Sequence, residues 1–158
     1  MEKTQQSFTS FLRVFKIIHI GLVLGITVFG IFAWVSQKGV SYGIAENDIF
    51  IYVVPLAALM GYFASKALFQ RMLSAITIAD ETSSKIATYQ TASLVKYALI
   101  EGPAFLALIA FMLNGNALHL SIGIGLWLLL AYDRPTKAKL ARDLPLTMEE
   151  KQQLNNSL

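Results

Sequence analysis

The sequence of 158 residues contains no cysteine and few charged residues. The absence of cysteine excludes disulfide bonds, thiolate metal sites and a cysteine nucleophile. Charged residues make up only 15% of the chain and hydrophobic residues 55%, whereas a soluble domain usually carries about 25% charged residues. This composition is typical of a small polytopic membrane protein, and the length fits a single membrane domain over residues 1–158.

The signatures of common enzyme classes are also missing. The sequence has no P-loop, no Rossmann glycine pattern, no HExxH motif and no nucleophile elbow. Its two histidines, His19 and His119, fall near opposite faces of the membrane, and no further carboxylate is expected beside them. No metal site is therefore predicted. We expect a non-enzymatic protein without a cofactor.

Four apolar runs predict an all-α bundle of transmembrane helices, because about 20 apolar residues span a bilayer core. They cover about residues 17–35, 49–69, 94–113 and 117–132. The first run, after a short polar lead over residues 1–16, is longer than the apolar core of a cleavable signal peptide. We interpret it as an uncleaved helix. The second helix is expected to begin either at Ile49 or at Pro55.

Polar segments connect and follow these runs. In the segment 70–96, helical composition extends through Met72–Ala79 and resumes after the polar cluster Asp80–Ser84. Helices 2 and 3 are therefore expected to continue beyond the membrane as a cytoplasmic helical hairpin. The sequence Asn114–Asn116 predicts a tight turn between helices 3 and 4.

The tail over residues 133–158 is expected to be cytoplasmic and to contain short helices. Pro135 is a candidate start for a basic helix that runs through Arg142. The segment Thr147–Glu150 has capping-box spacing and predicts a second short helix. The basic residues of the tail from Arg134 to Arg142 are interpreted as topology determinants, with binding of anionic lipid as the alternative.

The basic residues fall almost entirely on one side of this predicted bundle. Twelve of the thirteen lie on the side of the termini and the hairpin: Lys3, Arg13, Lys16, Lys66, Arg71, Lys85, Lys96, Arg134, Lys137, Lys139, Arg142 and Lys151. Lys38 alone lies on the other side. The positive-inside rule then predicts a multi-pass protein of the cell (inner) membrane with both termini cytoplasmic. The charge distribution thus indicates lipid as the partner, and no nucleic acid.

Glu101 is a carboxylic acid inside an otherwise apolar run. It precedes Leu113, at the outer end of helix 3, by twelve residues, or about 18 Å, and so falls within the hydrocarbon core. An ionised carboxylate there costs at least a few kcal/mol, so Glu101 must be protonated, paired or beside a wet cavity. Two roles stay open: binding of a proton or cation, and a protonated carboxyl that joins helices by a hydrogen bond.

Three residues are candidates to assist Glu101. Tyr97 lies one turn earlier on the same helix face. Pro103 removes the amide that would bond the Leu99 carbonyl, so a kink is expected. His19 could reach toward Glu101 if helices 1 and 3 are neighbours, although an interfacial histidine is the plainer interpretation.

Helix 1 carries a GxxxG motif at Gly21 and Gly25, and Gly30 extends its small-residue face. Small residues allow membrane helices to approach closely. These three glycines are therefore candidates for helix packing, either within the chain or in an oligomer.

The segment from about Gly61 to Leu113 resembles the hairpin of rotary ATPase proteolipid (c) subunits. In that family a cytoplasmic polar loop joins two helices, and a carboxylate lies within the second. The matching features here are the loop Asp80–Ile86 and the sequence Ala98–Gly102. The resemblance implies reversible protonation of Glu101. Outside this segment the chain resembles small four-helix bacterial inner-membrane proteins.

Two functions fit these observations. The first is a membrane protein whose Glu101 binds a proton or cation, in a homo-oligomer or as a subunit of a larger membrane complex. The alternative is a structural or accessory subunit that docks a partner through the hairpin and the tail.

Overall fold

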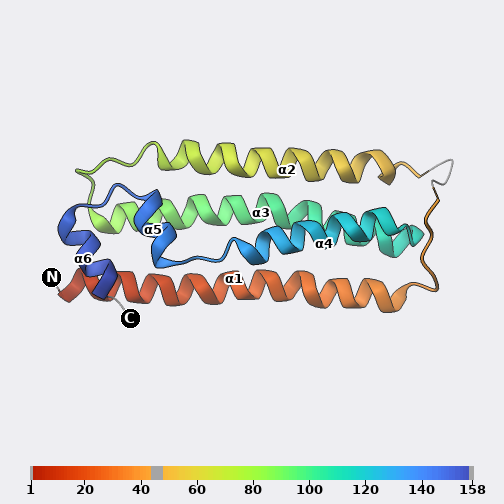
Figure 1. The fold of residues 1–158 in the computed structure, drawn as a ribbon, viewed down its shortest axis with the longest axis horizontal. Helices are drawn as coiled ribbons and strands as arrows, with labels where there is room; N and C mark the ends of the chain where they lie inside the picture. Colours follow the sequence, from red (N-terminus) through yellow and green to blue (C-terminus); the bar gives the residue numbers. More distant parts are fainter. Residues whose placement is uncertain (1, 44–47, 157–158) are drawn as a thin grey trace.

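The computed structural model describes residues 2–43 and 48–156 and is all-helical (Figure 1). The helices are α1 (Glu2–Ser36), α2 (Phe50–Leu73), α3 (Thr82–Asn114), α4 (Ala117–Tyr132), α5 (Lys137–Asp143) and α6 (Met148–Asn156). The helices α1 to α4 lie side by side along the long axis, and α3 packs against the other three. The predicted all-α bundle is confirmed.

The two ends of the bundle differ in what they carry (Figure 1). Both termini, the α2–α3 connection, α5 and α6 lie at one end, which we name the basic end. The α3–α4 turn lies at the other, which we name the loop end. As a result, α1 and α3 run in the same direction, and α2 and α4 run in the opposite direction.

Three helices are long and apolar enough to cross a membrane within the described part of the chain. They are Phe8–Ser36 of α1, Phe50–Leu73 and Thr82–Asn114. The helix α4 is apolar but shorter, and its bounds agree with the prediction. Large apolar side chains point outward from α1 and α2, among them Ile17, Val28, Ile31, Leu56, Leu59 and Phe63. Monomeric soluble proteins rarely expose such a surface, which supports a membrane protein.

The first helix begins much earlier than predicted. It starts at Glu2, so the segment expected to be a polar lead is helical. This part of α1 buries four apolar side chains, Phe8, Phe11, Leu12 and Phe15. Their spacing of three or four residues places them on one helix face. A search for continuous apolar runs misses such a stripe, because polar residues interrupt it on the other faces.

The α2–α3 connection holds less helix than predicted. The helix α2 begins at Phe50, contains Pro55 and ends at Leu73, so the expected helical structure up to residue 79 is wrong. The Thr77 amide instead donates to the Asp80 carboxylate (2.8 Å). Such a side chain–backbone bond competes with the helical ladder. It also holds the pKa of Asp80 below its usual value.

The predicted tight turn between α3 and α4 is present. Gly115 has φ of 70°, in the left-handed region that favours glycine. Its amide donates to the Phe111 carbonyl (2.7 Å), which ends α3. The Asn116 side chain then accepts from the Leu118 amide (2.9 Å) and caps α4.

The tail folds back onto the bundle. The helix α5 begins at Lys137, two residues after the predicted start, because Thr136 caps it. The predicted capping box opens α6: the Glu150 amide donates to Thr147 Oγ1 (3.2 Å), and the Thr147 amide donates to the Glu150 carboxylate (2.7 Å). Four leucines of the tail are buried: Leu140, Leu144, Leu146 and Leu154. The apolar face of the tail is therefore used within this chain.

An ion pair joins α6 to the first turn of α3. The Glu150 carboxylate accepts from the Lys85 ammonium (3.0 Å) and from the Thr82 hydroxyl (2.6 Å). The Lys85 side chain is 1% exposed and the Glu150 side chain 10%. Burial alone would raise the pKa of Glu150, but the bonds from Thr82, the Thr147 amide and Lys85 outweigh it and lower the pKa.

The lowered pKa of Glu150 predicts that α6 loosens in acid. A carboxyl whose pKa falls on folding stabilises the fold above its unfolded pKa of about 4.3, and this stabilisation is lost as the pH falls through the folded-state pKa. Hydrogen-exchange protection factors of the α6 amides should therefore fall below about pH 4. In the Glu150→Gln variant, protection should be lower at neutral pH and lack this step. An identical acid response in both proteins would contradict the assignment.

Candidate functional site

Glu101 lies within α3 and has no partner in the described part of the chain. Its side chain is half-buried. No hydrogen bond or ion pair reaches it from the side chains that the structure describes, those of residues 8–43 and 48–156. Glu101 therefore lies in a long apolar helix. Its carboxyl group makes no hydrogen bond within the described part of the chain.

Contacts between α1 and α3 define the surroundings of Glu101. The rings of Phe29 and Phe105 meet one turn beyond it, with centroids 5.3 Å apart. Because the two helices run in the same direction, Gly25 and Glu101, each four residues earlier, lie at about the same level along α1 and α3. Gly25 is exposed, and a Cβ atom added to it would meet no atom within 4 Å. The surface of α1 at the level of Glu101 is therefore open at Gly25.

Two of the predicted neighbours of Glu101 bond elsewhere. Tyr97 is buried, and its hydroxyl donates to the Asp133 carbonyl (2.9 Å). The ring of His19 packs edge-on against Tyr97 (5.1 Å between centroids), and its Nε2 bonds the Leu130 carbonyl (2.9 Å). Since a carbonyl only accepts, Nε2 of His19 carries a proton. Both residues join α1 and α3 to the end of α4 and do not reach Glu101.

Pro103 adjoins the closest approach between α2 and α3. The helix α3 is continuous through Pro103, which leaves the Leu99 carbonyl without its helical donor. Gly61 of α2 packs against this position. A Cβ atom on Gly61 would overlap the Leu99 carbonyl oxygen and lie 2.8 Å from Pro103 Cγ. Only glycine fits here without a shift of the backbone.

The three candidate packing glycines of α1 divide into two kinds. Gly30 packs within the chain, because a Cβ atom there would lie 3.7 Å from Leu108. Gly21 and Gly25 are exposed, with no atom within 4 Å of an added Cβ. The GxxxG face is therefore open on the outer surface of this chain.

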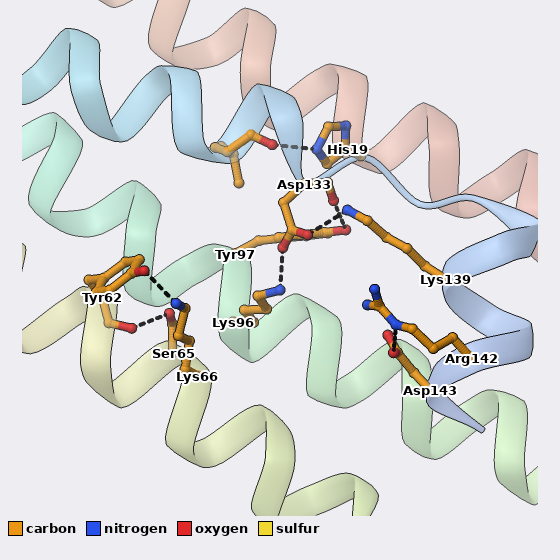
Figure 2. A network of polar contacts seen from close by, with 11 residues as sticks. His19, Tyr62, Ser65, Lys66, Lys96, Tyr97, Asp133, Lys139, Arg142 and Asp143 are labelled. Atoms are coloured by element: carbon orange, nitrogen blue, oxygen red, sulfur yellow. Dashed lines mark hydrogen bonds and ion pairs between the residues drawn. The ribbon is translucent and has the colours of Figure 1, made fainter. Parts of the chain in front are cut away.

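A polar network at the basic end was not predicted from the sequence (Figure 2). The Asp133 carboxylate pairs with Lys96 and with Lys139 (2.7 Å). The Lys96 ammonium also lies over the Phe69 ring, 4.8 Å from its centroid. These contacts join α2, α3 and α5. In the sequence, Asp133 only marks the end of an apolar run, and nothing indicates its two partners.

A second unpredicted cluster lies at the loop end. The sequence places no carboxylate beside His119, but Asp48 Oδ2 lies 3.1 Å from its Nε2, and both side chains are buried. The same oxygen accepts from Asn114 (2.7 Å), and Asp48 Oδ1 accepts from the Phe50 amide (3.0 Å). Three helices are joined here. The described residues contain no group of three or more His, Cys, Asp or Glu that could hold a metal ion.

Comparisons with protein-family models, with curated proteins and with solved structures found no match. The resemblance to proteolipid subunits therefore depends on the polar loop and on Glu101 alone. The glycine-rich repeat of that family's first helix is absent from residues 49–68. Any function proposed for this chain therefore depends on the geometry around Glu101.

Proposed function

We propose that this chain is a non-enzymatic multi-pass membrane protein in which Glu101 binds a proton or a cation within the bilayer. The observation that carries the proposal is the half-buried carboxyl without a partner in the described chain, at the level of the open α1 surface at Gly25. An ionised carboxylate in hydrocarbon costs at least a few kcal/mol. Glu101 is therefore protonated at rest, or it is paired with a group that another molecule supplies.

A second copy of the chain, or another subunit, covers this open surface in the proposed assembly. The open GxxxG face of Gly21 and Gly25 supports this arrangement, because such faces allow close helix contact. The proposal includes α4 as a fourth span, about 24 Å long. Both termini are proposed to be cytoplasmic in the cell (inner) membrane, in line with the charges at the basic end.

Proton flux into liposomes tests this function. The purified protein is reconstituted, a potassium diffusion potential is applied, and internal pH is followed with a dye. Wild type should carry a proton current, and Glu101→Gln should fall to the rate of protein-free liposomes. Glu149→Gln, which removes an exposed carboxylate from α6, is the matched control and should behave as wild type. Equal flux through wild type and Glu101→Gln would refute the role of Glu101.

One observation favours the accessory alternative. Ile78, at the tip of the α2–α3 connection, is 61% exposed and would suit a docking contact. The tail contributes less than expected to such a surface, because its leucines are buried in this chain. Absence of flux in wild type, together with loss of a co-purifying partner in the Ile78→Ser variant, would favour this alternative.

A further inference from the structure

A cavity at the basic end is lined by an excess of positive charge. Its volume is about 650 Å³, and it lies between α2, α3 and α5. The charged side chains that line it are Lys66, Lys96, Lys139, Arg142, Asp133 and Asp143. Four cations and two carboxylates leave a net charge of +2, so the cavity favours an anion.

The two carboxylates leave part of this positive charge uncompensated. Asp133 is shared between two lysines, and Asp143 Oδ1 accepts from Arg142 Nε (2.8 Å). The Lys66 ammonium has no carboxylate partner in the described chain; it contacts the Tyr62 hydroxyl and lies 4.2 Å from that ring's centroid. Arg142 is 72% exposed and keeps further N–H donors. Lys66 and Arg142 thus offer donors of the kind that bind phosphate oxygens.

The cavity lies at the depth expected for lipid headgroups. Lys66 lies two turns before the end of α2, and Lys96, near the middle of α3, pairs with Asp133, which directly follows the apolar helix α4. In the proposed orientation, this level is the headgroup layer of the cytoplasmic leaflet, where anionic lipids attract basic side chains.

An apolar groove continues from the cavity along α2 and α4. It is lined by Ala58, Leu59, Tyr62, Ile122, Gly125, Leu126 and Leu129, and its volume is about 390 Å³. Tyr62 is one turn from Lys66, and Leu129 is one turn from Asp133, so the groove adjoins the cavity. Figure 2 shows Tyr62 beside Lys66 at this junction. The groove leads away from the basic end toward the membrane-spanning part of the bundle.

From the cavity and the groove together, we infer that the basic end binds an anionic phospholipid. The phosphate is held by Lys66 and Arg142, and one acyl chain lies in the α2–α4 groove. A soluble phosphate compound shares the headgroup chemistry, but it would leave the apolar groove empty. This inference is independent of the role of Glu101, which lies on the side of α3 that faces α1.

Native mass spectrometry tests the inference. The full chain is measured in detergent, with phosphatidylglycerol and phosphatidylcholine added in turn. Wild type should retain phosphatidylglycerol in preference to phosphatidylcholine. The double variant Lys66→Gln, Arg142→Gln should bind it about 25-fold more weakly, at about fivefold per basic side chain. The matched control, Arg13→Gln with Arg71→Gln, removes two exposed charges near the basic end that do not line the cavity. It should bind as wild type does.

A variant of the groove and a soluble competitor distinguish binding of a lipid from binding of a free phosphate compound. Gly125→Leu should fill the groove, since Gly125 has open space beside it, and should weaken lipid binding without affecting glycerol phosphate. Equal retention of the two lipids by wild type would overturn the inference, as would an equal loss in the control double variant. Complete displacement of the lipid by equimolar glycerol phosphate, or unchanged lipid binding by Gly125→Leu, would also overturn it.

Discussion

Replacing Glu150 by glutamine is expected to lower the free energy of unfolding by about 3–5 kcal/mol. Lys85 is 1% exposed, and removal of its carboxylate partner leaves a buried charge without compensation, which is costly in this range. Glutamine preserves the shape of the side chain and can still serve in the capping box with Thr147. The loss therefore reports the missing charge and not a missing helix cap.

Denaturant unfolding of the detergent-solubilised protein measures this effect. Glu149→Gln makes the same change in the neighbouring, exposed position and should shift stability by less than about 0.5 kcal/mol. Adding Lys85→Met to Glu150→Gln should recover much of the loss, because no unpaired charge then remains. A Glu150→Gln variant as stable as Glu149→Gln would show that the pair contributes nothing.

Replacing Gly61 by alanine is expected to destabilise the bundle by about 1–3 kcal/mol, the usual cost of overpacking a core. The new methyl group would overlap the Leu99 carbonyl oxygen and crowd Pro103. Since neither backbone nor a proline ring can rotate away, α2 and α3 must separate locally. This effect should appear although alanine favours helix more than glycine does.

Gly125→Ala is the control for this substitution. Gly125 also lies inside a helix, but nothing lies within 4 Å of its added Cβ. Thermal unfolding should show Gly125→Ala at least as stable as wild type and Gly61→Ala clearly less stable. If both variants melt at the wild-type temperature, α2 does not approach α3 as closely at Gly61 as the structure has it.

Features that depend on neighbouring residues could be predicted from the sequence. The Asn114–Asn116 turn and the Thr147–Glu150 capping box both use local backbone bonds, and both are present. The apolar run of α4 contains no Asp, Glu, Lys or Arg, and its bounds agree with the helix. Local chemistry determines these elements almost completely.

Features that depend on distant residues could not be predicted. Asp48 and His119 are 71 positions apart, and Lys85 and Glu150 are 65 apart. The sequence of one segment does not indicate which distant residue its side chains will contact. These pairs can therefore be recognised only in the packed structure. The buried stripe of α1 was missed for a different reason, since its apolar residues are spaced for an amphipathic helix.

Glu101 was identified from the sequence alone, but its surroundings were not. Its expected depth in the membrane follows from counting residues along an apolar helix. Its neighbours depend on how α1 packs against α3, and His19 and Tyr97 are bonded to the end of α4. At the level of Glu101, the surface of α1 is open at Gly25.

Reaction of membrane-embedded protein with an apolar carbodiimide tests the role of Glu101 most directly, because this reagent modifies protonated carboxyls within lipid. Peptide mass spectrometry after labelling in liposomes should map the adduct to Glu101, with a yield that falls as the pH is raised. Glu101→Gln should remain unmodified under the same conditions. An intact wild-type protein without an adduct at Glu101 at any pH would contradict reversible protonation of this carboxyl.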